Sequence, residues 1–195
     1  GGCSRAMSVD IACPKPACWS APVPYDPPPE LATLDLASIA QLVTERKLPP
    51  VEQWQPTKTG DSEMHITADG RWFHQGGEIR RPAMVRAFSS LLRRDADGSY
   101  QLVTPHERLS ISVDDAPFIA VECRREGEGT KSTFAFRLNT DDLVIAGPEH
   151  GIDARPFPYL HVRGNLWAKL SRPVYYELAE IALEEKPDAP GIWSS

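Results

Sequence analysis

The sequence lacks the features that would assign it at once to a large class of proteins. No apolar run approaches the roughly twenty residues that a transmembrane helix needs. The formal net charge of −6 leaves no overall excess of Lys and Arg, which argues against binding to nucleic acid through its phosphates. The start of the chain also lacks the basic residues and apolar stretch of a secretory signal. We therefore expect no nucleic-acid partner, no membrane partner and no export.

Motifs of common enzymes and metal sites are missing as well. There is no Gly-x-Ser-x-Gly motif, no phosphate-binding glycine loop and no pair of His at metal-ligand spacing. Cys13 and Cys18 could bind metal or form a disulfide, but their spacing matches no common zinc pattern. We expect no metal and no cofactor.

The four cysteines indicate a reducing compartment. Cys123 lies in an apolar run, where a thiol behaves as a small hydrophobic group, and the other three crowd the N-terminus. That N-terminal segment is rich in Pro and poor in apolar residues, so we predict a disordered Pro/Cys-rich tail over 1–30. A C-terminal tail is predicted over 187–195, and the expected location is cytoplasmic.

Two segments of the chain resemble each other. Each has a His between two apolar residues, a turn, a Trp, and an Arg-Pro that opens an apolar-periodic stretch. The first copy contains Met64-His65-Ile66, Asp69-Gly70, Trp72 and Arg81-Pro82, and the second contains Leu160-His161-Val162, Gly164-Asn165, Trp167 and Arg172-Pro173. Both copies are typical of a hairpin followed by a helix that has Pro at its first position. We predict a duplicated hairpin-helix core with a seam between the copies.

The pattern of apolar residues predicts an α+β protein with two domains. An N-terminal α+β domain over 31–98 contains helices at 35–46 and 82–93 with strands at 63–67 and 71–74 between them. From Tyr100 the period changes to two, which is typical of half-buried antiparallel strands. Seven strands are predicted at 100–104, 108–113, 117–124, 131–138, 142–146, 159–163 and 166–170, followed by a helix from 173 to 184. Seven strands and a C-terminal helix outline a pleckstrin-homology-like barrel over 99–186.

Several ordered motifs resemble a known family. They are Trp72-Phe73 with Ile79, Arg81-Pro82, Val85, 88–94, 102–105, 114–118 and His161-Val162-Arg163. Together, from about Leu48 to Ser194, they resemble the bacterial family catalogued as domain of unknown function 1285. The resemblance implies a duplicated α+β core with a pleckstrin-homology-like second half, and a ligand or protein site between the halves. It implies no catalytic residues.

Positive charge gathers where the second predicted helix begins. Arg80, Arg81 and Arg86 lie near free backbone N–H groups, which favour an anion. Arg172 occupies the matching place in the second copy, although Ser171 could cap that helix instead. The alternative is that these arginines pair with acidic residues across the seam, where Glu177 aligns with Arg86.

Trp72 and Trp167 could line a ligand-stacking surface in the seam, or each could pack against its own helix as a core residue. The predicted ligand-binding set is Trp72, Arg80, Arg81, Arg86, Arg163, Trp167 and Arg172. His65 and His161, which also coincide between the copies, are expected to be exposed or hydrogen-bonded rather than catalytic. Asp114 and Asp115 could be paired acid–base carboxylates, but Pro117 favours a turn that connects two strands.

Three functions remain compatible with the sequence. The first is a non-enzymatic binding module, in signalling for example, that holds a peptide, a protein or a small anionic ligand between its halves. The second is a hydrolase or transferase that uses His74, His106, His150 or His161 beside a carboxylate. The third is a structural or assembly protein that pairs through an exposed strand edge. We expect a monomer or a weak dimer.

Overall fold

The computed structural model describes residues 29–128, 131–153 and 157–185. The tail predicted over 1–30 therefore lies outside the described residues except for Pro29 and Glu30, and the tail predicted over 187–195 lies entirely outside them. Within the described ranges, no helix has the length and apolar character needed to cross a membrane.

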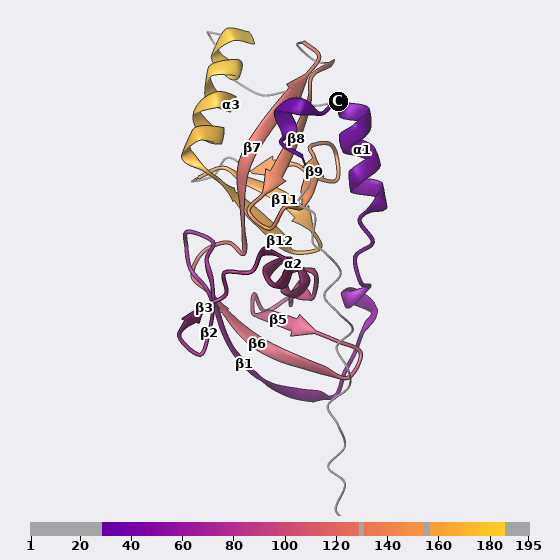
Figure 1. Ribbon diagram of the computed structural model, residues 1–195, viewed down its shortest axis with the longest axis vertical. Coiled ribbons are helices and arrows are strands. Elements are labelled where there is room, and N and C mark those ends of the chain that lie inside the picture. The colour runs from indigo at the N-terminus through magenta and orange to yellow at the C-terminus, as the bar shows by residue number, and fades with distance from the viewer. Residues whose placement is uncertain (1–28, 129–130, 154–156, 186–195) are drawn as a thin grey trace, which may run out of the picture.

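The protein is a mixed α+β structure with two six-stranded sheets (Figure 1). The first sheet has the order β3-β2-β1-β6-β5-β4, and the second has the order β10-β11-β12-β7-β8-β9. The strands of the first sheet are β1 (Lys58–Ile66), β2 (Trp72–His74), β3 (Gly77–Glu78), β4 (Leu92–Arg94), β5 (Tyr100–Val103) and β6 (Glu107–Val113). Those of the second are β7 (Phe118–Glu126), β8 (Thr133–Leu138), β9 (Leu143–Ile145), β10 (Ile152–Asp153), β11 (Tyr159–Arg163) and β12 (Leu166–Leu170).

Both sheets have the same connectivity. Each consists of two antiparallel three-stranded units, and the first strand of the first unit pairs in parallel with the last strand of the second unit. The parallel pairs are β1 with β6 and β7 with β12. These two similar halves fit an internal duplication.

Three helices accompany the sheets, together with the short 3-10 segments η1 (Leu31–Thr33) and η2 (Val51–Gln53). Helix α1 (Leu36–Glu45), which Asp35 caps by accepting from the backbone N–H of Ser38, runs along the second sheet near β9. Helix α2 (Pro82–Ser90) lies between the two sheets in Figure 1. Helix α3 (Arg172–Glu185) packs beside β7 through Val174 and Leu178.

One apolar core runs through both halves. Ile66, Trp72 and Leu102 of the first sheet belong to the same buried cluster as Phe118 and Leu166 of the second. A smaller cluster lies under α1, where Leu31 and Ile39 cover Ala135. The N-terminal segment from Leu31 to Glu45, which we call the strap, thus covers apolar surface of the second sheet.

The second helix and the strand count differ from the sequence prediction. The helix predicted over 82–93 ends at Ser90, because Leu92 to Arg94 pair with β5 as strand β4. The seven-stranded barrel is not confirmed, since the strands predicted at 100–104 and 108–113 are β5 and β6 of the first sheet. The other five lie in the second sheet, and the short strand β10 is its sixth.

The division predicted at 98/99 falls in the turn between β4 and β5, inside the first sheet. The chain passes from one sheet to the other between Val113 and Phe118. The domain bounds as independently folding units stay a prediction.

Candidate functional site

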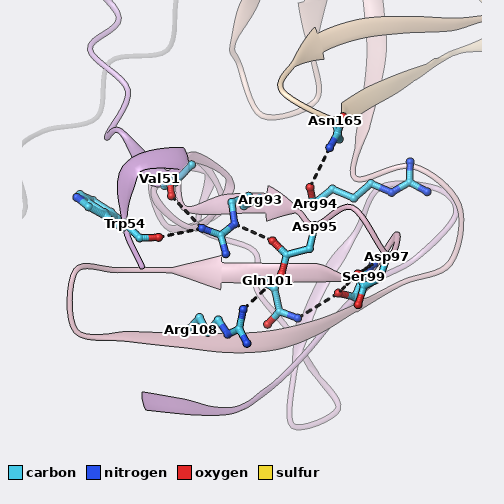
Figure 2. Close-up of polar contacts among 10 residues, drawn as sticks. All are labelled: Val51, Trp54, Arg93, Arg94, Asp95, Asp97, Ser99, Gln101, Arg108 and Asn165. Atoms are coloured by element: carbon cyan, nitrogen blue, oxygen red, sulfur yellow. Dashed lines mark hydrogen bonds and ion pairs between the residues drawn. The ribbon is translucent and has the colours of Figure 1, made fainter. Parts of the chain in front are cut away.

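The two halves meet through the turns of their hairpins. In the β1–β2 turn, the carbonyl oxygen of Gly70 accepts from Nδ2 of Asn139 at 3.0 Å, and Oδ1 of Asn139 accepts from the N–H of Ile119 at 2.9 Å. In the β11–β12 turn, Nδ2 of Asn165 donates to the carbonyl oxygen of Arg94 at 3.3 Å (Figure 2). Each hairpin turn therefore docks on the opposite half.

Two of the predicted arginines connect α2 to the second half. Nη1 of Arg86 donates to the carbonyl oxygen of Asp141 at 2.7 Å, and Nη2 of Arg163 donates to the carbonyl oxygen of Ser89 at 2.6 Å. The guanidinium of Arg163 also lies over the ring of Phe118, with 5.4 Å from Cζ to the ring centroid. The structure thus brings Arg86 and Arg163 to the seam, where both bind backbone.

The interior of the seam is packed. Trp72 is 1% exposed and belongs to the shared core, as the core-packing interpretation predicts. Trp167 is half-buried and lies on the face of β12 that points away from the core. Its ring meets the ring of His161 edge-on, with 5.0 Å between the centroids. The similar sequences therefore do not give the two tryptophans equivalent surroundings, because Trp72 pairs with the buried Ile66 whereas Trp167 pairs with His161 on the face away from the core.

The remaining predicted arginines are exposed at helix starts. Arg80 pairs with Glu78 at 3.0 Å between Nε and Oε2. Arg81 holds the N-cap position of α2 without a side-chain cap hydrogen bond. Arg172 is the first residue of α3, and Ser171 precedes it. An anion site at either helix start stays a prediction.

A groove lies beside the seam, between the end of the strap and the second sheet. Its volume is about 230 Å³. It is lined by Val43, Arg46, Leu48, Val162, Arg163, His150 and the residues 142–145. We call it the Arg46 groove. None of the residues that line it belongs to the first sheet.

A charged cluster forms one side of the Arg46 groove. The side chain of Asp142 is 7% exposed, and its Oδ1 lies 2.8 Å from Nε of Arg46 and 3.7 Å from Nη2 of Arg86. Burial lowers the pKa of the Arg163 guanidinium, and the negative charge of Asp142 acts in the opposite direction. The Nη2 atom of Arg46 is buried and has no hydrogen-bond partner among the described residues.

The sequence prediction did not include Arg46, Asp142 or His150 as ligand-binding residues. Arg46 and Asp142 are 96 positions apart, so no local pattern connects them. One feature of the sequence could have indicated Arg46 as a site residue. It directly follows an amphipathic helix, and the apolar face of that helix packs on the second sheet.

The buried Arg93 illustrates an arginine whose bonds are fully structural (Figure 2). Its Nε lies 2.8 Å from Oδ1 of Asp95, and its Nη1 donates to the carbonyl oxygens of Val51 and Trp54. These bonds fix η2 to β4 and so place the chain that leads from α1 into β1.

The two adjacent carboxylates of the β6–β7 connection diverge, as the turn interpretation predicts. Oδ1 of Asp114 lies 2.7 Å from Nε2 of His65 on the surface. Asp115 accepts from the hydroxyl of Tyr159 at 2.7 Å and from Nζ of Lys169 at 2.6 Å. They do not form a paired acid–base site.

The histidines are held by backbone or lie at the surface. The ring nitrogens of His161 lie 2.6 and 2.7 Å from the carbonyl oxygens of Glu149 and Gly164. Nδ1 of His150 lies 3.2 Å from the carbonyl oxygen of His161. His74 and His106 are exposed. No group of three or more metal-ligating side chains occurs among residues 29–128, 131–153 and 157–185.

Comparisons with known proteins identify relatives of this chain. Residues 49–116 match the family model "Domain of unknown function (DUF1285), N-terminal domain", and residues 117–195 match "Protein of unknown function (DUF1285), C-terminal domain". The boundary between the two matches lies in the connection between β6 and β7. No curated protein matched the sequence.

Two solved structures are similar to this chain. A DUF1285 family protein from Silicibacter pomeroyi is 39% identical, with a TM-score of 0.64 over 73% of this chain and 82% of that one. A DUF1285 family protein from Shewanella baltica is 26% identical, with a TM-score of 0.49 over 60% of this chain and 90% of that one.

Proposed function

The chain belongs to the DUF1285 family, and we propose that it is a non-enzymatic binding module that holds a peptide or a small anionic ligand in the Arg46 groove. The observation that carries this proposal is that the guanidinium groups of Arg46 and Arg163 both line the groove, where Asp142 is the one carboxylate among the lining residues. Guanidinium groups form strong, paired hydrogen bonds with anionic oxygens.

The electrostatics of the groove support an anion over a cation. Arg46 and Arg163 line it together with a single carboxylate, that of Asp142. A guanidinium keeps its charge in proteins, so the lining carries excess positive charge that a bound anion would neutralise.

The contacts of the histidines favour binding over catalysis. Near the groove, the ring nitrogens of His150 and His161 lie within hydrogen-bond distance of carbonyl oxygens. The pair of His65 with Asp114 is 42% and 49% exposed and lies on β1 and the β6–β7 connection, not in the groove. A general base needs a substrate held beside it, which an open surface does not provide.

The proposal extends to three finer points. The six strands of the second sheet with α3 packed against β7 support a pleckstrin-homology-like second half. The half-buried free thiol of Cys123 supports a cytoplasmic location. A module that changes its surface when a ligand fills a groove between its parts suits a role in signal transduction.

The test is a ligand screen of the whole chain against a groove-blocking variant. Small carboxylates, phosphates, sulfonates and acidic peptides are screened by ligand-observed NMR and by the thermal unfolding midpoint. Leu48, which is 38% exposed and lines the groove, is replaced in Leu48→Trp to fill it. The matched control is Met84→Trp, since Met84 is 40% exposed on α2 and outside the groove.

We expect at least one anion to bind the wild type and Met84→Trp but not Leu48→Trp. Binding that survives in Leu48→Trp, or a screen in which no anion binds at millimolar concentration, would overturn the proposal.

A further inference from the structure

We infer that the ligand of the Arg46 groove is a monocarboxylate with a short aliphatic body, an inference that rests on the proposed function. Three properties of the groove lead to this class: its net charge, the guanidinium groups that supply its donors, and the apolar character of its other walls.

The net charge of the groove matches a single negative charge. The lining residues Arg46 and Arg163 are opposed by Asp142, which leaves one positive charge. Two more charged residues act on this lining. The positive charge of Arg86, which pairs with Asp142, is balanced by the negative charge of Glu52, which acts on Arg163. A dianion such as a phosphate monoester would therefore bring one negative charge more than the site neutralises.

The donors of the groove come from two guanidinium groups. Nε of Arg46 is engaged with Asp142 and Nη2 of Arg163 with the carbonyl oxygen of Ser89. His150 also lines the groove, and because a carbonyl oxygen can only accept, its Nδ1 donates to His161, so Nε2 of the neutral ring is an acceptor. The donors for a ligand are therefore the remaining N–H groups of the two guanidiniums, whose paired geometry matches the two oxygens of a carboxylate.

The apolar walls require an aliphatic body. Val43, Leu48, Val144 and Val162 line the groove beside the charged cluster. Its volume of about 230 Å³ lies below the roughly 300–1,000 Å³ of sites for drug-sized ligands. A carboxylate with a short chain would place its charge at Arg46 and its methylenes against these side chains.

The experiment compares ligands of equal length and different head groups on the whole chain. Straight-chain carboxylates of two to ten carbons are titrated by calorimetry and NMR, beside the alkyl phosphates, alcohols and ammonium ions of the same lengths. The proteins are the wild type, Arg46→Gln, Arg46→Lys, Leu48→Trp, the exposed control Arg71→Ala, and Arg81→Ala, which tests the predicted anion site at the start of α2.

We expect carboxylate affinity to rise about fourfold per added methylene until the groove is full. Arg46→Gln is expected to weaken binding at least tenfold, Arg46→Lys to weaken it less because it keeps the charge, and the control Arg71→Ala to leave it unchanged. Alcohols and ammonium ions are expected not to bind. Because Arg86 still pairs with Asp142, Arg46→Gln should fold, which its thermal unfolding midpoint would verify.

The failures of this inference and of the proposed function are distinguishable. Alkyl phosphates that bind more tightly than carboxylates, and that Leu48→Trp excludes, would overturn the ligand class and leave the groove as the binding site. Loss of binding in Arg81→Ala with retention in Arg46→Gln would overturn the inference and place the anion at the start of α2. No binding of any head group would overturn the inference and count against the proposed function.

Discussion

Replacing Gly70 by Ala tests whether the β1–β2 turn docks on the second half. A Cβ at this position would lie 2.5 Å from Nδ2 of Asn139 and 2.9 Å from Cδ1 of Ile119. The residue also has a φ of +79°, which an L side chain rarely adopts. The substitution therefore combines backbone strain with a clash against the other half.

Gly76→Ala provides the matched control. Gly76 has a φ of +80°, and a Cβ there would have no neighbour within 4 Å. We expect Gly76→Ala to lower the free energy of unfolding by about 1 kcal/mol through strain alone. Gly70→Ala should lower it by about 3 kcal/mol, because displacing Asn139 weakens a hydrogen bond worth about 1 kcal/mol and displacing Ile119 costs about as much again.

The assay is urea unfolding of both variants, followed by tryptophan fluorescence and circular dichroism. Equal losses in the two variants would refute the docking of this turn. The double variant Gly70→Ala, Asn139→Ala supplies a further check, since removal of the Asn side chain makes room for the new methyl group. The free energy of unfolding that the double variant loses should be smaller than the sum of the losses in Gly70→Ala alone and Asn139→Ala alone.

Two further predictions concern titrating groups. The pKa of Asp115 is lowered: burial raises it, but the hydrogen bonds from Lys169 and Tyr159 outweigh burial. Its ionised form thus stabilises the fold above pH about 4, and this stability is lost as the pH falls. Tyr159→Phe should lower the free energy of unfolding by about 1 kcal/mol at pH 7 and by less at pH 3, as urea unfolding at both pH values would show, and a pH-independent loss would contradict this assignment. Burial, with a smaller effect of Glu177, raises the pKa of Cys123 to about 12, so iodoacetamide at pH 8 should modify Cys123 only after unfolding in urea. Peptide mapping measures this, and rapid labelling of Cys123 in the native protein would contradict it.

Elements with a clear period were predictable from the sequence. Helix α1, predicted over 35–46, follows from the helical spacing of Leu36, Ile39 and Val43. The strands β7 and β8 were predictable from their alternation of apolar and polar residues. They pair as antiparallel strands, as that pattern indicates. The last helix was predicted within one residue at each end.

Elements without a period of their own were not predictable. Strands β3, β4 and β10 contain two or three residues each, which is too short for an alternating pattern of apolar and polar residues to be recognised. Leu92 continued the apparent helical pattern of α2, but its pairing with Leu102 placed it in a strand. This is a case in which tertiary contacts override local preference.

The candidate site was predicted in part. Arg163 and Arg86 were in the predicted set, and both lie at the seam. Trp72 has the sequence context of a surface aromatic as much as of a core residue, and only the pairing of β2 decides that it points inward. Arg46 reaches Asp142 because the strap crosses the second sheet, a path that no local pattern encodes.

The parallel pairing of the first and last strand in each sheet has a consequence for folding during synthesis. Lys58 pairs with Glu107, and Phe118 pairs with Ala168. The first strand of each sheet can therefore pair with its parallel partner only after about fifty further residues have left the ribosome. Such distant pairing is slow, because the entropy of loop closure precedes the contacts that compensate for it. Each half is therefore expected to fold in one late step, and the first half completes its sheet before the central strands of the second have all been made.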